Sequence, residues 1–263
     1  MKTFYFTGTG NSLYVAKVIG GDLYSIPQMV QAGQHEFKDD AIGFVFPCYA
    51  LGIPRMVKNF VSESVFTADY FFAVMTYGGM AAAGVRIMED AGRENGIEFD
   101  YSDQILMVDN IRVIVQQEFE EKKDASNELR ESIQRVAANI RNRKKQLLEV
   151  SDKFVEMTRS EYSDLTHSYL DENDSKYELT GDCNQCKTCE KVCPTGNIIV
   201  TDKPIFSHKC EACFACIHHC PNYVINREYG DYGPPLAPPI SNARYINPNI
   251  ELKEVIESNN IKK

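Results

Sequence analysis

Eight of the nine cysteines in the chain fall within residues 183–220, where they form two runs of the same spacing. The first run consists of Cys183, Cys186, Cys189 and Cys193, and the second run of Cys210, Cys213, Cys216 and Cys220. Each cysteine of the second run follows its partner by 27 residues, and a proline ends each run. Three thiolates at two-residue gaps can bind three corners of one iron–sulfur cube, so the spacing predicts two [4Fe-4S] clusters.

Two other uses of eight cysteines fit the sequence less well. Zinc ribbons contain paired C-x2-C knuckles, whereas these runs contain triplets followed by C-x3-C-P. A disulfide framework is typical of secreted proteins, and the N-terminus has no signal-peptide pattern. The spacing therefore favours iron–sulfur chemistry over zinc or disulfides.

The doubled run resembles the eight-iron bacterial ferredoxins, which also have apolar residues after each proline, here Ile198 and Val224. In that family the fourth cysteine of each run ligates the other cluster. The resemblance implies one cluster bound by Cys183, Cys186, Cys189 and Cys220, and a second bound by Cys210, Cys213, Cys216 and Cys193.

The loop of the first run departs from the ferredoxin pattern. It carries the polar residues Asn184, Gln185, Lys187 and Thr188, where such ferredoxins have small or apolar residues. Polar groups and solvent near the sulfur atoms shift the reduction potential. We therefore expect the two clusters to differ in potential.

A second stretch whose residues could bind a cofactor lies at residues 7–12, Thr-Gly-Thr-Gly-Asn-Ser. It follows a strand expected at residues 2–6 and precedes a helix expected at 13–19, and a helix N-terminus after such a loop can bind phosphate. The loop contains no Lys or Arg, lacks the Walker A ending and lacks the third glycine of a dinucleotide fingerprint. It resembles the phosphate loop of flavodoxins, which implies bound FMN; the alternative is an ordinary glycine-rich turn.

The elements that would position this loop alternate between strands and helices. Strands are expected at residues 22–26, 41–46, 70–75 and 105–108, with helices between them. This alternation predicts an α/β fold with a doubly wound parallel sheet. The resemblance to flavodoxins implies five strands in the order 2-1-3-4-5, with FMN at the switch between strands one and three.

In that order the loops after strands one, three and four meet at one edge of the sheet. They supply the candidate cofactor-binding residues Thr7, Gly8, Thr9, Gly10, Asn11, Ser12, Pro47, Cys48, Tyr49, Ala50, Leu51, Gly52, Thr76, Tyr77, Gly78 and Gly79. Tyr49 and Tyr77 are either flavin-stacking rings or core residues. Cys48 is best explained as a small buried hydrophobic residue; a flavin contact is the second explanation, and a redox-active thiol is the third.

The remaining segments suggest a two-domain chain with a connection. Leu129, Ile133 and Ile140 follow helical spacing within an expected helix at 124–150. Residues 151–182 are polar and turn-rich, so we expect a linker between a flavodoxin-like domain (1–150) and a ferredoxin-like α+β domain with an extension (183–263). Residues 233–239 are expected to be extended, and Leu252 begins a short terminal helix. We expect His218 and His219 to be exposed loop residues; the alternative is that they tune the reduction potential of a cluster.

Composition limits the partners. The formal net charge is −9, which disfavours nucleic acid and suits redox proteins with a basic surface. No run approaches 18 apolar residues, so no membrane span is expected. Cysteines that bind clusters imply a reducing compartment, or at least cofactor loading before export, and we expect a cytoplasmic protein. The sequence contains no signal for the oligomeric state.

Together the two stretches resemble the iron–sulfur flavoproteins of anaerobic microbes, in which a flavodoxin-like domain precedes an eight-iron ferredoxin domain. The resemblance implies an intracellular electron-transfer protein that passes electrons between two [4Fe-4S] clusters and FMN and exchanges them with a redox protein or a small-molecule donor or acceptor. An FMN-dependent reductase of a small molecule, fed by the clusters, is the alternative. A sensor or scaffold with an empty flavodoxin-like domain is a third reading. The flavin loops contain no evident catalytic constellation, which favours electron transfer.

Overall fold

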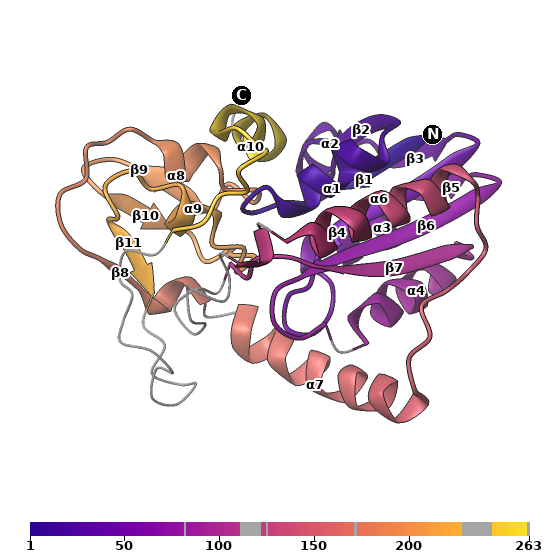
Figure 1. Cartoon of the computed structure of the whole chain (residues 1–263). Coiled ribbons are helices and arrows are strands. Elements are labelled where there is room, and N and C mark those ends of the chain that lie inside the picture. The colour runs from indigo at the N-terminus through magenta and orange to yellow at the C-terminus, as the bar shows by residue number, and fades with distance from the viewer. Residues whose placement is uncertain (82, 111–121, 125, 171–172, 228–243, 262–263) are drawn as a thin grey trace.

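The computed structural model describes residues 1–81, 83–110, 122–124, 126–170, 173–227 and 244–261. A larger α/β part is built on a five-stranded sheet, and a smaller part with two short antiparallel sheets lies beside it (Figure 1). We call these the flavodoxin-like region (residues 1–141) and the cluster region (residues 173–227).

The five-stranded sheet confirms the predicted topology. Its strands are β1 (Lys2–Tyr5), β2 (Asp22–Ser25), β4 (Ala41–Pro47), β6 (Tyr70–Tyr77) and β7 (Tyr101–Leu106). They lie in the order β2-β1-β4-β6-β7 and every neighbouring pair is parallel, which is the order 2-1-3-4-5 along the chain. A separate parallel pair is formed by β3 (Glu36–Lys38) and β5 (Val65–Thr67).

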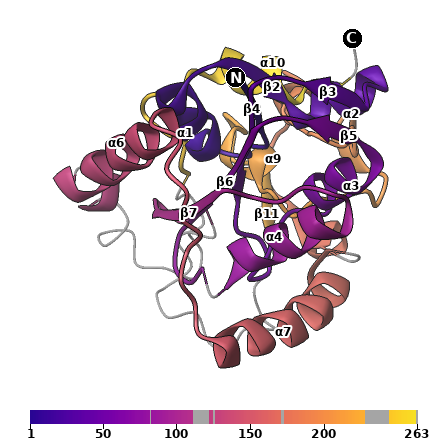
Figure 2. The ribbon, with the colours of Figure 1, turned by 90° about the vertical axis from the view of Figure 1, so that its right-hand side faces the viewer.

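Helices cover both faces of this sheet, as a parallel sheet requires. One face carries α1 (Asn11–Ile19) and α6 (Asn127–Arg141), and the other carries α2 (Ile26–Ala32), α3 (Arg55–Glu63) and α4 (Gly84–Glu94) (Figure 2). The central strands β4 and β6 are almost entirely apolar, and all their residues except the last of each strand are buried. The main core lies between these strands and the helices.

The fifth strand begins four residues earlier than predicted. We expected residues 105–108, but β7 spans Tyr101–Leu106 and begins with polar residues. Their side chains are bonded inside the fold: Ser102 Oγ donates to Glu89 Oε1 at 2.6 Å, and Arg135 Nη1 donates to Asp103 Oδ2 at 2.8 Å. Polar residues can therefore occupy a buried strand that hydropathy alone does not reveal.

Two predicted segments differ from the structure around the connection. The helix expected at 124–150 is α6, which ends at Arg141, because the chain turns there and Gln146 then forms a bridge beside Tyr101. The turn-rich linker expected at 151–182 contains a 19-residue helix, α7 (Asp152–Leu170). Tertiary contacts explain this helix: Tyr162 Oη donates to Ile53 O at 2.9 Å, and Ala83 N donates to Thr158 Oγ1 at 3.0 Å.

The cluster region repeats one unit twice. The first copy comprises β8 (Tyr177–Leu179), α8 (Thr188–Lys191) and β9 (Ile198–Val200), and the second comprises β10 (Pro204–Phe206), α9 (Ala215–His218) and β11 (Ile225–Arg227). Each element of the second copy begins 27 residues after its partner, as the cysteines do. The copies exchange strands, because β8 pairs with β11 while β9 pairs with β10. A short 3-10 helix, η1 (Asn173–Lys176), precedes β8.

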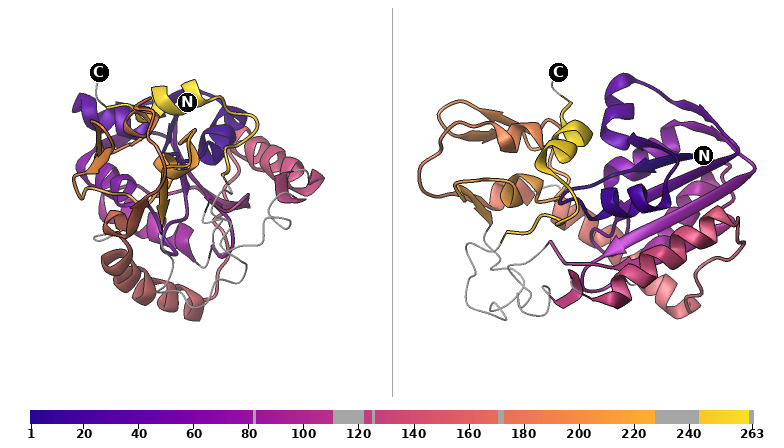
Figure 3. Two further views of the ribbon diagram at one scale, coloured as in Figure 1. Left: turned by 90° about the vertical axis from the view of Figure 1, so that its left-hand side faces the viewer. Right: turned by 45° about the horizontal axis from the view of Figure 1, so that its top comes forward.

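The C-terminal segment returns to the flavodoxin-like region. Its helix α10 (Leu252–Asn259) packs against both α2 and α8, and so lies between the two regions (Figure 3). Asn259 Nδ2 donates to Thr7 O at 2.9 Å and to Val192 O at 3.2 Å. The extended segment expected at 233–239 lies outside the described residues. No helix in the described part of the chain is long and apolar enough to cross a membrane.

Candidate cofactor sites

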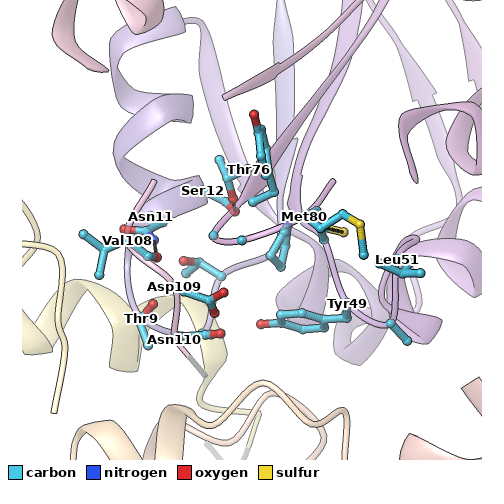
Figure 4. A pocket seen from close by; sticks show the side chains of 18 of the residues that line it. Thr9, Asn11, Ser12, Tyr49, Leu51, Thr76, Met80, Val108, Asp109 and Asn110 are labelled. Atoms are coloured by element: carbon cyan, nitrogen blue, oxygen red, sulfur yellow. Dashed lines mark hydrogen bonds between the residues drawn. The ribbon is translucent and has the colours of Figure 1, made fainter. Parts of the chain in front are cut away.

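A cavity of about 270 Å³ opens at the carboxyl edge of the five-stranded sheet. The loops after β1, β4, β6 and β7 line it, and β11 of the cluster region adds one residue. Figure 4 shows Thr9, Asn11 and Val108 on one side of the cavity, Leu51 and Met80 on the other, and Tyr49 and Asp109 between them. Its lining contains Thr7, Gly8, Thr9, Asn11, Ser12, Pro47, Cys48, Tyr49, Ala50, Leu51, Thr76, Tyr77, Gly78, Gly79, Met80, Val108, Asp109, Asn110 and Arg227.

Hydroxyl groups gather where the loop after β1 meets the N-terminus of α1. Thr7 Oγ1 accepts the Gly10 N–H at 3.1 Å, so its own O–H is still able to donate to a ligand. Ser12 Oγ lies 2.9 Å from Thr76 Oγ1, and one proton of that pair is likewise available. Both Thr7 and Ser12 are buried. Together with the first N–H groups of α1, this end of the cavity suits an anion.

Asn11 has a structural role that the sequence did not indicate. Its Nδ2 donates to Val108 O at 2.9 Å, and its Oδ1 accepts from Tyr245 Oη at 2.9 Å and from Asn247 Nδ2 at 3.0 Å. The amide thereby joins three segments, and one N–H remains for a ligand. The C-terminal segment thus supports the loop from behind.

Two of the predicted cofactor-binding glycines lie outside the cavity lining. Gly10 adopts φ +98°, and a Cβ there would meet Asn247 and Ile250 of the C-terminal segment at 3.1 Å. A Cβ on Gly52 would meet the Tyr162 ring of α7 at 2.3 Å. Both glycines therefore permit packing behind the loops.

The aromatic and sulfur side chains on the cavity wall have different environments. Tyr49 is buried and packs edge-on against Phe6, with ring centroids 6.2 Å apart, so it belongs to the core as well as to the lining. Tyr77 is half-buried. Burial raises the pKa of the Cys48 thiol to about 12, and the negative charge of Asp109 acts in the same direction. Cys48 therefore stays protonated near neutral pH, which weakens the redox-thiol reading.

The predicted residues of this site did not include one loop, nor Met80 and the distant Arg227. Val108, Asp109 and Asn110 follow β7, and the misplaced strand boundary hid them. Arg227 comes from β11, and its guanidinium lies 5.6 Å from the centroid of the Phe214 ring. The loop after β7 follows from the strand order alone, but no local signal marks Arg227.

Four thiols from the two cysteine runs surround a second, smaller cavity in the cluster region. Its lining includes Cys193 of the first run together with Cys210, Cys213 and Cys216 of the second. We call these four the near set. Burial raises the pKa of Cys216 well above its usual value, and the charges of Cys210, Cys213 and Cys193 raise it further.

The other four thiols form the far set, which consists of Cys183, Cys186, Cys189 and Cys220. Burial raises the pKa of Cys189 to about 12, and the charges of Cys220, Cys186 and Cys183 add to this. The structure therefore brings each fourth cysteine to the other run. Among the described residues, no three His, Cys, Asp or Glu side chains are placed to hold a single metal ion.

Backbone N–H groups point at the sulfur atoms in the same way in both runs. Gln185 N donates to Cys183 Sγ at 3.4 Å, and Ala212 N donates to Cys210 Sγ at 3.3 Å. At the other end of each run, Asn197 N donates to Cys193 Sγ and Val224 N donates to Cys220 Sγ, both at 3.3 Å. Such donors stabilise thiolates, the form that binds iron.

The second run is packed directly against the cavity at the carboxyl edge of the five-stranded sheet. A Cβ on Gly8 would lie 2.6 Å from Cys213 O, so only glycine allows this approach. Asn110 Nδ2 donates to the same carbonyl at 3.3 Å. Gly8 and Asn110 both line the cavity, so the near set and the cavity share one wall.

The two histidines of the second run are buried, which corrects the expectation of exposed loop residues. His218 Nε2 donates to Asn110 O at 2.7 Å, and its Nδ1 accepts the Tyr245 N–H at 3.0 Å. His219 Nε2 donates to Gly8 O at 3.3 Å. Burial lowers the pKa of His219 to about 4, so it is neutral near pH 7. Both rings join the second run to the cavity loops.

An ion pair makes a further connection between the regions. Glu211 is buried, and its Oε2 accepts the Met56 N–H at 3.3 Å at the start of α3. Arg55 Nε lies 3.5 Å from Glu211 Oε1, and Arg55 Nη2 donates to Cys210 O at 3.2 Å. These contacts hold the loop of the second run at Cys210 and Glu211.

Comparisons with known proteins agree on the cluster region. Residues 175–221 match the family of 4Fe-4S dicluster domains. Over 45 residues the chain is 49% identical to a component of an ion-translocating oxidoreductase complex from Methanosarcina acetivorans, which is 16% of this chain and 17% of that protein. The chain thus matches about a sixth of the length of this relative. The C-terminal part contains a 4Fe-4S dicluster domain, whose chemistry is one-electron transfer.

A solved structure resembles the other part of the chain. The Trp repressor binding protein from Bacillus subtilis aligns with 51% of this chain and 96% of its own, at 10% sequence identity and a TM-score of 0.34. A TM-score this low does not assign a fold, so the assignment of a flavodoxin-like fold rests on the strand order of the sheet.

The residues present fit the two cofactor types that the sequence predicted. The thiols of the near set surround a cavity, and sulfur atoms of both sets receive backbone N–H donors, which suits iron–sulfur cubes. The larger cavity has a hydroxyl-rich end at a helix N-terminus and an aromatic and apolar wall, which suit the phosphate and the ring of FMN.

Proposed function

We propose that this protein is an electron-transfer iron–sulfur flavoprotein. When bound, its two [4Fe-4S] clusters supply single-electron chemistry and its FMN takes one or two electrons. The chain holds these groups close together and exchanges electrons with a redox partner. The strongest support is the close contact between the Cys213 carbonyl and Gly8, which lines the cavity proposed to bind FMN.

Each part of the chain has a defined task in this proposal. The near set binds one cluster, the far set binds the other, and the hydroxyls of Thr7 and Ser12 bind the FMN phosphate. Asn110, which donates to Cys213 O, and His219, which donates to Gly8 O, keep the near set against the cavity. A fixed short separation favours transfer within one chain over collisions between chains.

We expect electrons to be exchanged with a redox partner at the cluster of the far set. Cys186 is exposed, whereas all four thiols of the near set are buried. Asp182 and Lys187 beside it are also exposed, so this edge has mixed charge. The net charge of −9 still attracts a basic redox protein at long range, and we expect the exchange rate to fall as ionic strength rises.

Stopped-flow reduction of the fully loaded protein tests this function. With a low-potential donor, cluster absorbance should bleach first, and flavin absorbance should follow at a rate that does not depend on protein concentration. A rate of flavin reduction that scales with protein concentration would place the transfer between molecules. Absence of FMN after anaerobic reconstitution would favour a sensor or scaffold.

A reductase of a small molecule is the second candidate, and a specific observation favours it. Asp109 and Arg227, one negatively and one positively charged side chain, both line the cavity beside the proposed FMN loops. Charged groups there can orient a polar substrate. Rapid reduction by a nicotinamide and turnover of a small acceptor by cluster-free protein would support this reading over electron transfer.

A further inference from the structure

The sulfur of Cys210 accepts more hydrogen bonds than its repeat partner. Asn173 Nδ2 lies 3.3 Å from Cys210 Sγ, Tyr177 Oη lies 3.6 Å from it, and the backbone N of Ala212 lies 3.3 Å from it. Asn173 Nδ2 also donates to Tyr177 Oη at 2.7 Å. Two side chains from η1 and β8, outside both cysteine runs, thus converge on one thiolate.

The repeat shows that these side chains are an addition to a common backbone pattern. The backbone bond from Ala212 has its counterpart in Gln185, which donates to Cys183. The side-chain donors have no counterpart, because the residues 27 positions after Asn173 and Tyr177 are Val200 and Pro204. Neither has a side-chain donor. The extra bonds therefore distinguish Cys210 of the near set from Cys183 of the far set.

The orientation of Asn173 is set by its donors. Its side chain is 1% exposed, and its Oδ1 has no hydrogen-bond partner among the described residues. A thiolate accepts hydrogen bonds and cannot donate, so the amide nitrogen must face Cys210. A buried amide with an unsatisfied oxygen destabilises a fold, and such a group calls for a functional explanation.

We propose that Asn173 is a positioning residue that, together with Tyr177, raises the reduction potential of the near cluster. Reduction adds negative charge, and a donor aimed at a ligand sulfur stabilises that charge. This inference rests on the proposed assignment of Cys210 to the near cluster.

The test is a redox titration of loaded Asn173→Leu, followed by EPR. Leucine keeps the branched shape and the number of side-chain heavy atoms and removes the donor. We expect one of the two four-iron centres to become harder to reduce, with its reduction constant falling about tenfold, which is about 59 mV for a one-electron couple. The other centre should keep its midpoint. Unchanged midpoints at both centres, with full iron content, would overturn the inference.

Two variants serve as controls. Tyr177→Phe removes only a hydroxyl and should shift the same centre in the same direction, so it provides the test if Asn173→Leu fails to retain iron. Thr188→Val removes the hydroxyl that lies 3.3 Å from Cys186 Sγ and should affect the other centre only. If Tyr177→Phe and Thr188→Val shift the same centre, Asn173 does not act selectively on the near set.

The outcome is independent of the flavin. A shift of one cluster potential in protein that never binds FMN would support the role of Asn173 while rejecting the flavoprotein function. Internal transfer to FMN with unchanged potentials in Asn173→Leu would do the reverse.

Discussion

The two cysteine runs have the same backbone but opposite surroundings. Positive φ angles occur at Gln185 and Lys187 in the first run and, 27 residues later, at Ala212 and Phe214 in the second. The loop of the first run is mostly exposed, whereas every residue at 210–219 in the second is buried. Backbone geometry that builds a cluster site was thus kept in both copies, and the side chains adapted one copy to solvent and the other to the flavodoxin-like region.

This difference gives the copies separate tasks. Polar residues such as Asn184 and Lys187 suit an edge that meets water and transient partners, and residues such as Glu211 and His219 connect the second copy to α3 and to Gly8. Burial, solvent access and hydrogen bonds to sulfur all shift cluster potentials. We therefore expect the two clusters to be inequivalent.

We expect the largest effect from a substitution that shows whether the clusters follow the two cysteine runs or the near and far sets. Cys220 belongs to the second run but to the far set, so Cys220→Ala should remove the cluster of Cys183, Cys186 and Cys189. Iron and sulfide analysis should show loss of about half of the iron. EPR should retain the signal of the near centre. Loss confined to the centre of Cys210, Cys213 and Cys216 would contradict the cross-ligation.

A second change tests the wall shared by the near set and the cavity. Gly8→Val places side-chain atoms against Cys213 O, a backbone atom that cannot easily move, so we expect a loss of about 3 kcal/mol in unfolding free energy and loss of FMN binding. Denaturant titration and flavin fluorescence measure these effects.

Gly79→Ala is the matched control for Gly8. Gly79 also lines the cavity, but a Cβ there would meet Asp109 Oδ2 at 3.4 Å, which is ordinary contact. We expect a change below about 1 kcal/mol. Equal effects at the two glycines would mean that contact with Cys213 is unimportant.

A third comparison uses two positions related by the repeat. Glu211→Ala removes a buried carboxylate that accepts the Met56 N–H and pairs with Arg55, so unfolding free energy should fall by about 2 kcal/mol. The equivalent Asn184 is exposed, and Asn184→Ala should change it by less than about 0.5 kcal/mol. Thermal or denaturant unfolding would decide, and equal losses would contradict the proposed difference between the runs.

The smallest effect is expected at the ninth cysteine. Cys48 lies outside both runs, and its raised pKa keeps it neutral. Cys48→Ala should leave iron content and flavin reduction unchanged and cost less than about 1 kcal/mol of stability. A loss of flavin reduction in this variant would revive the redox-thiol reading.

Much of the molecule could be predicted from local patterns. The spacing of the cysteines indicated a doubled cluster motif, and the motif at residues 7–12 indicated an anion-binding strand–helix turn. The alternation of strands and helices indicated a doubly wound parallel sheet, and the strand order came from the resemblance to flavodoxins. These features depend on residues close together in sequence, where thiol spacing and helix N-termini determine the chemistry.

Tertiary structure decided which parts of the chain meet. The contact of His219 with Gly8 joins residues 211 positions apart, and Asn173 reaches Cys210 across 37. Asn173 lies in a polar stretch that also fits an exposed loop, and His219 is a polar residue in a cysteine-rich loop, so hydropathy could not reveal that both are buried. The position of Arg227 at the cavity and the helical state of Asp152–Leu170 likewise depend on packing between segments distant in the chain. Local propensity determined the elements, and the long-range burial of polar groups with partners determined how the two cofactor sites are joined.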